Sequence, residues 1–200
     1  MFLHSGNLKK RMKRAASNGA LRAGSVSGGT YVSDGFFCLW IRDGFVPNKI
    51  KGLLAEFTGE TEWEEDTGVA VKKNVIQRET PVSKAFDLSR FYYEREETIE
   101  LKQTFLRYKG EILFQEKESG TVIQADEELY ALLDGREIEH DSGELLPECC
   151  LLEPKRNLLL WKNNAGCLIF PARLLDSEDS AGKELLGALR EMDLEERRGL

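Results

Sequence analysis

Histidine is scarce in this sequence of 200 residues, which contains only His4 and His140. General acid or base catalysis most often uses a histidine, or a carboxylate whose pKa is tuned in a pocket. We expect His4 to lie in a loose terminus, and His140, beside Asp141 and Ser142, is typical of a solvated turn. The sequence therefore predicts no catalytic residue and a protein that is not an enzyme, unless a deep polar pocket gathers His140 with neighbouring carboxylates.

Cysteine spacings of the metal-binding or redox kind are also absent. The chain has four cysteines without a CxxC spacing: Cys38, Cys149, Cys150 and Cys167. All four lie in apolar, strand-like stretches, where a free thiol packs as a small hydrophobe. Consecutive strand residues such as Cys149 and Cys150 point to opposite faces and cannot easily bind one metal ion. We predict neither a metal ion nor a cofactor.

Motifs for phosphate and calcium are missing as well. The glycine-rich stretch "AGSVSGGT" lacks the Lys-Ser/Thr ending of a phosphate-binding loop and is typical of a flexible connector. The acidic side chains of "GETEWEEDTG" are crowded rather than spaced like those of a calcium loop. This stretch therefore predicts an exposed acidic loop.

No apolar run approaches the roughly 20 residues that span a bilayer. The longest runs cover residues 36–41 and 158–161, and the opening stretch "MFLHSGNLKKRM" lacks the apolar segment of a signal peptide. With 41% hydrophobic and 32% charged residues, the chain can bury one good core or two small ones. We expect a globular cytoplasmic protein without a membrane partner.

Negative charge is absent from the first 33 residues. This segment carries six cations, so the rest of the chain must carry −13 to give the net charge of −7. A basic segment on an acidic body predicts an anionic partner, although a helix can also pair with its own acidic body. Both interpretations stay open at this point.

The basic residues lie on a predicted amphipathic helix from Asn7 to Asn18. Its apolar positions follow helical spacing and are Leu8, Met12, Ala15 and Ala16. Four cations fall on the opposite arc: Lys9, Lys10, Lys13 and Arg14. Asn18 and Gly19 tolerate the left-handed conformation that ends a helix. The sequence therefore predicts a helix with a basic outer face.

Strand patterns dominate the next part of the chain. Asp34 and Gly35 supply the turn of a hairpin, and the apolar residues 36–41 are typical of an enclosed strand. Further strands are predicted over residues 69–76, 98–108, 111–118, 121–124 and within 148–171. Short helices are predicted at residues 47–59, 82–92 and 125–135. Together these elements predict an α+β fold, a mostly antiparallel sheet with two or three packed helices.

A second amphipathic helix is predicted after Asp176, within residues 177–200. Its apolar stripe consists of Leu185, Leu186, Leu189 and Met192. Such a stripe predicts contact with a protein surface, either within the chain or on a partner.

The order of these features resembles one domain of the bacterial DNA sliding clamp. The hairpin "VSDGFFCL" is similar to the family's Thr-Asp-Gly hairpin, with Ser33, Asp34 and Gly35 in the corresponding places. The stretch "ELYALLDG" is similar to the helix before the last strands of the final clamp domain. The family's chains finish on Met-Pro-Met-Arg-Leu, and "FPARL" matches it at Pro171, Arg173 and Leu174 but departs at Phe170 and Ala172. The resemblance covers about half of the chain.

This resemblance implies a clamp-like domain over residues 1–176, with an insertion at about residues 45–108. In the clamp family the first helix of each domain faces DNA, which implies that Lys9, Lys10, Lys13 and Arg14 contact the backbone of double-stranded DNA. A groove beside the C-terminal residues holds partner peptides in the family, which places a peptide groove near Phe170, Pro171, Arg173 and Leu174.

The helix after Asp176 has three possible positions under this resemblance. It lies in that groove as an internal ligand, packs between two copies of the chain, or caps the core of its own subunit. A clamp ring contains six domains, so this chain either oligomerises or has lost ring formation.

Two functions follow from these patterns. The first is a non-enzymatic, clamp-like binding module in DNA replication or maintenance. The alternative is a cytoplasmic protein-interaction or regulatory factor without DNA affinity, which docks through its acidic surface or its C-terminal helix.

Overall fold

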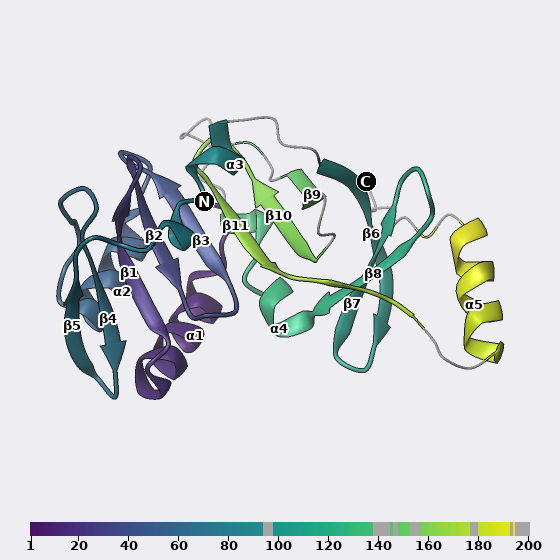
Figure 1. Ribbon diagram of the computed structural model, residues 1–200, viewed down its shortest axis with the longest axis horizontal. Helices are drawn as coiled ribbons and strands as arrows, with labels where there is room; N and C mark the ends of the chain where they lie inside the picture. The colour runs from purple at the N-terminus through teal and green to yellow at the C-terminus, as the bar shows by residue number, and fades with distance from the viewer. Residues whose placement is uncertain are drawn as a thin grey trace. The chain divides into compact units, whose positions relative to one another are not determined.

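The structure, a computed structural model, describes residues 1–93, 98–137, 145, 148–152, 157–176, 180–192 and 194. The chain forms two compact units, which we describe separately. Unit 1 comprises Met1–Arg95, Ala131–Glu148 and Trp161–Ile169, and unit 2 comprises Glu96–Tyr130, Cys149–Leu160 and Phe170–Leu200. Both units combine helices with antiparallel strands (Figure 1), which confirms the predicted α+β class. The resemblance implies one domain over residues 1–176, whereas these two units alternate along the chain, because residues distant in the sequence contact each other.

Unit 1 is built on an antiparallel sheet in the order β11-β3-β2-β1-β4-β5. Its strands are β1 (Leu21–Val26), β2 (Gly29–Ser33), β3 (Cys38–Arg42), β4 (Gly68–Lys72), β5 (Val75–Glu79) and the first part of β11 (Gly166–Pro171). Its helices are α1 (Ser5–Asn18), α2 (Asn48–Thr58), the short α3 (Ser89–Tyr93) and the single turns η1 (Lys84–Phe86) and η2 (Gly135–Glu137). Helices α1 and α2 pack against each other and against β4.

The predicted basic helix is confirmed, and it is anchored at both ends. His4 caps its N-terminus, where the imidazole Nδ1 accepts a hydrogen bond from the Asn7 amide at 3.1 Å. Gly19 ends it in the left-handed conformation with φ 80°. The preceding residues are not loose as expected: Phe2 is fully buried, and its carbonyl accepts a hydrogen bond from the Asp134 amide at 2.8 Å. The sequence hides this anchor because its partner lies far along the chain.

The sheet of unit 1 is covered on both faces. On one face Tyr31 and Trp40 are cross-strand partners, and Phe86 of η1 stacks on Tyr31 with ring centroids 4.8 Å apart. The other face packs against α1 and α2 and carries the buried side chains of Leu21, Ala23, Val32, Leu39, Ile41, Val69 and Val71. Successive residues along each strand alternate between these two environments, as the pleat requires.

Two predicted elements of unit 1 are shorter or divided in the structure. Residues 69–76 form two strands, β4 and β5, because Lys73 and Asn74 both adopt positive φ and close a tight hairpin. The helix predicted over residues 82–92 is reduced to η1 and α3. Phe36, predicted to lie inside a covered strand, is 66% exposed because it belongs to the turn before β3.

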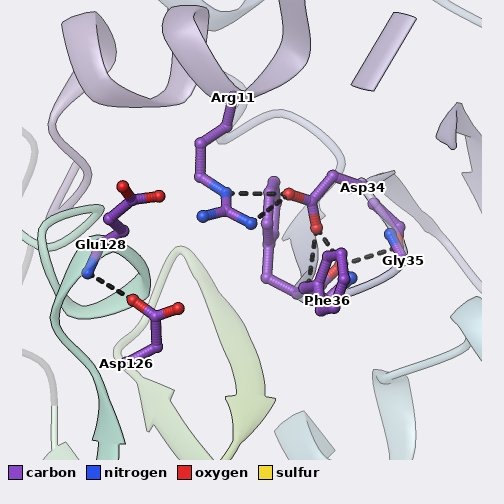
Figure 2. A network of polar contacts seen from close by, with 8 residues as sticks. Arg11, Asp34, Gly35, Phe36, Asp126 and Glu128 are labelled. Carbon is purple, nitrogen blue, oxygen red and sulfur yellow. Dashed lines mark hydrogen bonds and ion pairs between the residues drawn. The ribbon is translucent and has the colours of Figure 1, made fainter. Parts of the chain in front are cut away.

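Unit 2 contains a second antiparallel arrangement in the order β12-β8-β7-β6-β9. Its strands are β6 (Thr98–Tyr108), β7 (Glu111–Glu116), β8 (Val122–Asp126), β12 (Arg173–Leu174) and most of β9 (Glu148–Leu152). The strand β10 (Leu158–Lys162) and β11 contribute residues to both units. The predicted helix at residues 125–135 is a single turn, α4 (Glu127–Tyr130), which Asp126 caps by accepting a hydrogen bond from the Glu128 amide at 2.7 Å (Figure 2).

The second amphipathic helix, α5 (Ser180–Glu191), belongs to unit 2. The buried side chain of Gln115 on β7 holds its C-terminal end. Its amide nitrogen donates hydrogen bonds to the carbonyls of Leu189 and Met192 at 3.1 and 2.8 Å, and its oxygen accepts one from the Leu194 amide at 3.2 Å. This one side chain therefore satisfies backbone groups that the helix end leaves without an internal partner.

The turn between β7 and β8 also approaches α5 closely. Gly120 has φ +68°, and a Cβ at this position would collide with the backbone carbonyl of Arg190. Gly110, in the turn between β6 and β7, has φ +79°, and a Cβ there would meet open space. The two glycines therefore share a backbone conformation but differ in what a side chain would touch.

We predict that Gly120→Ala destabilises unit 2 more than Gly110→Ala. Both alanines must adopt the left-handed region, at a cost of about 1–2 kcal/mol, but only the substitution of Gly120 would also displace α5. Urea unfolding measures the two losses, and hydrogen exchange of the α5 amides reports whether the helix detaches. Equal losses with α5 still protected would contradict the close packing of Gly120 against α5.

Candidate nucleic-acid interface

The four predicted cations of α1, Lys9, Lys10, Lys13 and Arg14, are all exposed in the structure. They differ in their surroundings. The Lys9 ammonium lies 2.7 Å from a carboxylate oxygen of Glu56 on α2, and both side chains are about half exposed. This ion pair partly neutralises Lys9, although a pair so open to solvent stabilises the fold little.

Arg11 lies on the same helix but has a structural role. Its guanidinium donates two hydrogen bonds to one carboxylate oxygen of Asp34, at 2.8 and 2.6 Å, and Asp34 is only 5% exposed. The other carboxylate oxygen accepts hydrogen bonds from the amides of Phe36 and Phe37 at 2.8 and 2.9 Å (Figure 2). Arg11 therefore ties α1 to the turn between β2 and β3.

The fold adds two lysines that the helical pattern does not include. The turn between β4 and β5 meets the C-terminal end of α1, where the Asn74 amide donates a hydrogen bond to the Ala16 carbonyl at 3.4 Å. The Lys72 side chain packs so near Gly19 that a Cβ on the glycine would lie 2.7 Å from the Lys72 Cγ. Lys72 and Lys73 thus stand at the end of α1. A hairpin signal in "KKNV", with Asn74 suited to positive φ, would have revealed them.

This position is electrostatically favourable. The last turn of α1 contains no basic residue of its own, and the partial negative charge at a helix C-terminus attracts cations. We call the combined set the α1 cationic surface: Lys10, Lys13, Arg14, Lys72 and Lys73. Within the part of the chain that the structure describes, none of its four lysines forms an ion pair. Exposed ammonium groups of this kind can contact phosphates without reading base sequence.

The residues predicted to form a peptide groove lie in different environments. Phe170 is 1% exposed, whereas Pro171, Arg173 and Leu174 are exposed. The Arg173 guanidinium forms an ion pair with Glu111 at 2.7 Å. A groove of about 320 Å³ begins at the next residue and is lined mainly by Leu106, Tyr108, Leu113, Leu175, Leu185, Leu186 and Leu189. The groove in the structure therefore lies beside α5, and none of the four predicted residues lines it.

The apolar stripe predicted on α5 is only partly covered. Leu186 is 9% exposed and Leu189 is half-buried, whereas Leu185 and Met192 are 61% and 55% exposed. The helix thus packs on its own unit through Leu186 and Leu189. Its other edge, with Leu185, forms a wall of the groove.

Several groups with catalytic potential are protonated or engaged in local contacts. Burial raises the pKa of the Cys38 thiol, and it raises the pKa of Cys167 to about 12, so both thiols stay protonated at neutral pH. In the acidic loop, Glu62 accepts a hydrogen bond from Lys51 that lowers its pKa, and Glu60 pairs with Arg78 at 2.9 Å. Among the described residues, no group of three His, Cys, Asp or Glu side chains could hold a metal ion.

A polar pocket of about 280 Å³ lies beside this loop and is lined by residues that include Asp43, Lys51, Glu62 and Trp63. Burial and the nearby Glu65 and Glu62 raise the pKa of Asp43. His140, the residue that would favour an enzyme in such a pocket, lies outside the described residues.

No family model matches this chain, and no curated protein or solved structure is detectably similar to it. In the described part of the chain, no helix is long and apolar enough to cross a membrane.

We predict that Arg11→Gln and Lys10→Gln, which remove one charge each from α1, differ sharply in their effect on folding. Arg11→Gln leaves the buried Asp34 carboxylate without its cation and is expected to cost about 3 kcal/mol. Lys10→Gln changes an exposed position and is expected to stay within about 0.5 kcal/mol. Urea unfolding of the two variants measures the difference, and similar losses would contradict the separate roles of these cations.

Proposed function

We propose that this chain is a non-enzymatic, clamp-like binding module that contacts the backbone of double-stranded DNA, with a role in DNA replication or maintenance. The observation that carries the proposal is the convergence of two segments: Lys72, at the end of β4, and Lys73, in the following turn, lie at the C-terminal end of α1 and add to its exposed cations. The packing of α1 beside α2 under an antiparallel sheet also fits the resemblance to a clamp domain.

Charge explains why DNA would contact this surface and not another. Phosphate contacts by lysine release condensed counterions and make binding sensitive to salt but not to base sequence. The chain outside its first 33 residues carries −13, so most of the remaining surface repels a polyanion. The exposed cations of the α1 cationic surface attract a polyanion instead.

We predict that the protein binds a labelled duplex of about 20 base pairs at about 50 mM salt, with a Kd of about 1–100 μM that weakens as salt rises. The double variants Lys10→Gln/Lys13→Gln and Lys72→Gln/Lys73→Gln each remove two phosphate contacts. Each is therefore expected to lower the slope of log K against log salt by about 1.8. Fluorescence anisotropy across a salt series measures both quantities.

The control is the double variant Lys51→Gln/Lys117→Gln, which changes the net charge equally. Both of these lysines already form ion pairs, with Glu62 and Glu100, at 2.7 Å. Their replacement is expected to leave the slope nearly unchanged. Absence of duplex binding by the wild-type protein, or equal effects of all three double variants, would refute the proposal.

The second candidate function is protein interaction through α5 without DNA affinity. The observation that favours it is the exposure of Leu185, which lines the apolar groove, and of Met192 just after α5. Isolated exposed leucines are common, but here Leu185 lines a groove and Met192, the residue after the end of α5, adds a second exposed apolar side chain. Such an arrangement is typical of a docking surface.

We predict that a second copy of the chain covers this surface, so that the mass from light scattering rises above 22.7 kDa as concentration increases. Leu185→Gln/Met192→Gln is expected to keep the protein monomeric, since it removes the exposed apolar area. The matched control is Leu145→Gln, a change of a 66% exposed leucine in unit 1. A wild-type mass of 22.7 kDa at every concentration would exclude self-association.

A further inference from the structure

A compact aromatic cluster lies on the face of the unit 1 sheet that α1 and α2 do not cover. Trp40 of β3 contacts Tyr92 and Tyr93 of α3, with ring centroids 5.2 and 6.0 Å apart. Tyr92 and Tyr93 contact each other edge to face at 4.9 Å, with their ring planes perpendicular. Edge-to-face pairs at these distances stabilise one another beyond the area that they bury.

The cluster has a fixed base and one ring open to solvent. Trp40 is fully buried, and its indole N–H donates a hydrogen bond to the Val26 carbonyl at 3.0 Å. The Tyr92 hydroxyl donates a hydrogen bond to the Asn164 carbonyl. Tyr93, in contrast, is 61% exposed. A large aromatic ring is therefore held at the surface by a buried tryptophan and a half-buried tyrosine, although folding alone gains little from exposing it.

Two cations lie beside this cluster. The Arg42 guanidinium stacks on the Phe45 ring at 4.0 Å, and its charge acts on Tyr92, where it opposes the rise in pKa that burial causes. The Lys162 ammonium donates a hydrogen bond to the Phe91 carbonyl at 3.5 Å. Across the described residues, neither Arg42 nor Lys162 forms an ion pair.

We propose that Tyr93, supported by Tyr92 and Trp40 and with Arg42 and Lys162 at neighbouring residues, is a stacking site for a base of single-stranded nucleic acid. An exposed aromatic ring near cations is the arrangement that binds single strands, because the ring stacks on a base while the cations contact adjacent phosphates. A duplex cannot use this site, since its bases are already stacked on each other. The site therefore differs from the α1 cationic surface in its residues, its face of the sheet and its ligand.

The pairing of an aromatic ring with cations also argues for nucleic acid over a peptide. An apolar peptide side chain would gain from the ring but not from two unneutralised cations, whereas a nucleotide presents a flat base and a negative charge together. Arg42 adds a second flat surface, because its guanidinium plane already stacks on Phe45.

The test is fluorescence anisotropy of the full chain with a labelled oligo(dT) of about 15 nucleotides at about 50 mM salt. Tyr93→Ala is expected to weaken binding about 5- to 150-fold, which corresponds to the loss of one base–aromatic stack. Tyr93→Phe keeps the ring and is expected to bind within about 2-fold of wild type. Arg42→Gln is expected to lower the salt slope by about 0.7, the value for one phosphate contact with a single strand.

The matched control is Tyr108→Ala in unit 2, which removes another exposed tyrosine, 50% accessible, with the Lys109 ammonium 5.0 Å from its ring. An abasic strand with the same phosphates separates stacking from charge, since wild type and Tyr93→Ala should bind it equally. Urea unfolding of each variant confirms that the fold is intact.

Three results together would support the stacking site. Tyr93→Ala weakens oligo(dT) binding, Tyr93→Phe does not, and the two proteins with and without the Tyr93 ring bind the abasic strand equally. Absence of oligo(dT) binding by the wild type, or equal losses for Tyr93→Ala and Tyr108→Ala, would overturn it. Duplex binding is measured in parallel. If the wild type binds oligo(dT) but not the duplex, the proposed function is refuted. If it binds the duplex but its oligo(dT) binding does not depend on Tyr93, the stacking site is refuted.

Discussion

The ion pair between Arg11 and Asp34 fixes the geometry on which unit 1 depends. Asp34 accepts hydrogen bonds from Arg11 with one oxygen and from two turn amides with the other, so one carboxylate orients both α1 and the start of β3. Buried charges that are fully hydrogen-bonded specify an arrangement strongly, because any displacement leaves them unpaired. With Arg11 turned inward, Lys10, Lys13 and Arg14 are held on the outer arc of the helix. The same helix therefore carries one structural cation and several exposed ones.

The sheet of unit 1 separates two surfaces of different chemistry. One side holds α1 with its lysines, and the other holds Trp40, Tyr92 and Tyr93. Point charges suit a regular phosphate backbone, whereas an exposed ring suits an unstacked base. If both proposals hold, one unit presents duplex-binding and single-strand-binding surfaces back to back. Such a unit would suit positions where a duplex opens into single strands.

Local sequence signals predicted α1, α2 and the hairpin at Asp34 because capping, periodicity and turn residues act within a few positions. They failed where the deciding contact is distant. Nothing local indicates that Phe2 is held by Asp134, or that Gln115 and Gly120 meet α5. The alternating pattern predicts strand through Lys73 and Asn74, which form a turn instead, because both adopt a positive φ that is unusual for lysine. The sequence alone predicts the cations of α1 but not the lysines that lie next to them at the β4–β5 turn. It does not predict the aromatic cluster either, because the members of that cluster come from segments about fifty residues apart.

The contact between Gln115 and α5 gives the surface of unit 2 a direction. A primary amide has a donor end and an acceptor end, and here the donor end meets helix carbonyls while the acceptor end meets an amide further along the chain. A helix lying the opposite way would present N–H groups, which the same side chain meets only after its amide exchanges the positions of its nitrogen and oxygen. The orientation of the Gln115 amide is therefore matched to the direction of the helix packed on it, with the nitrogen toward a C-terminal end, as in α5.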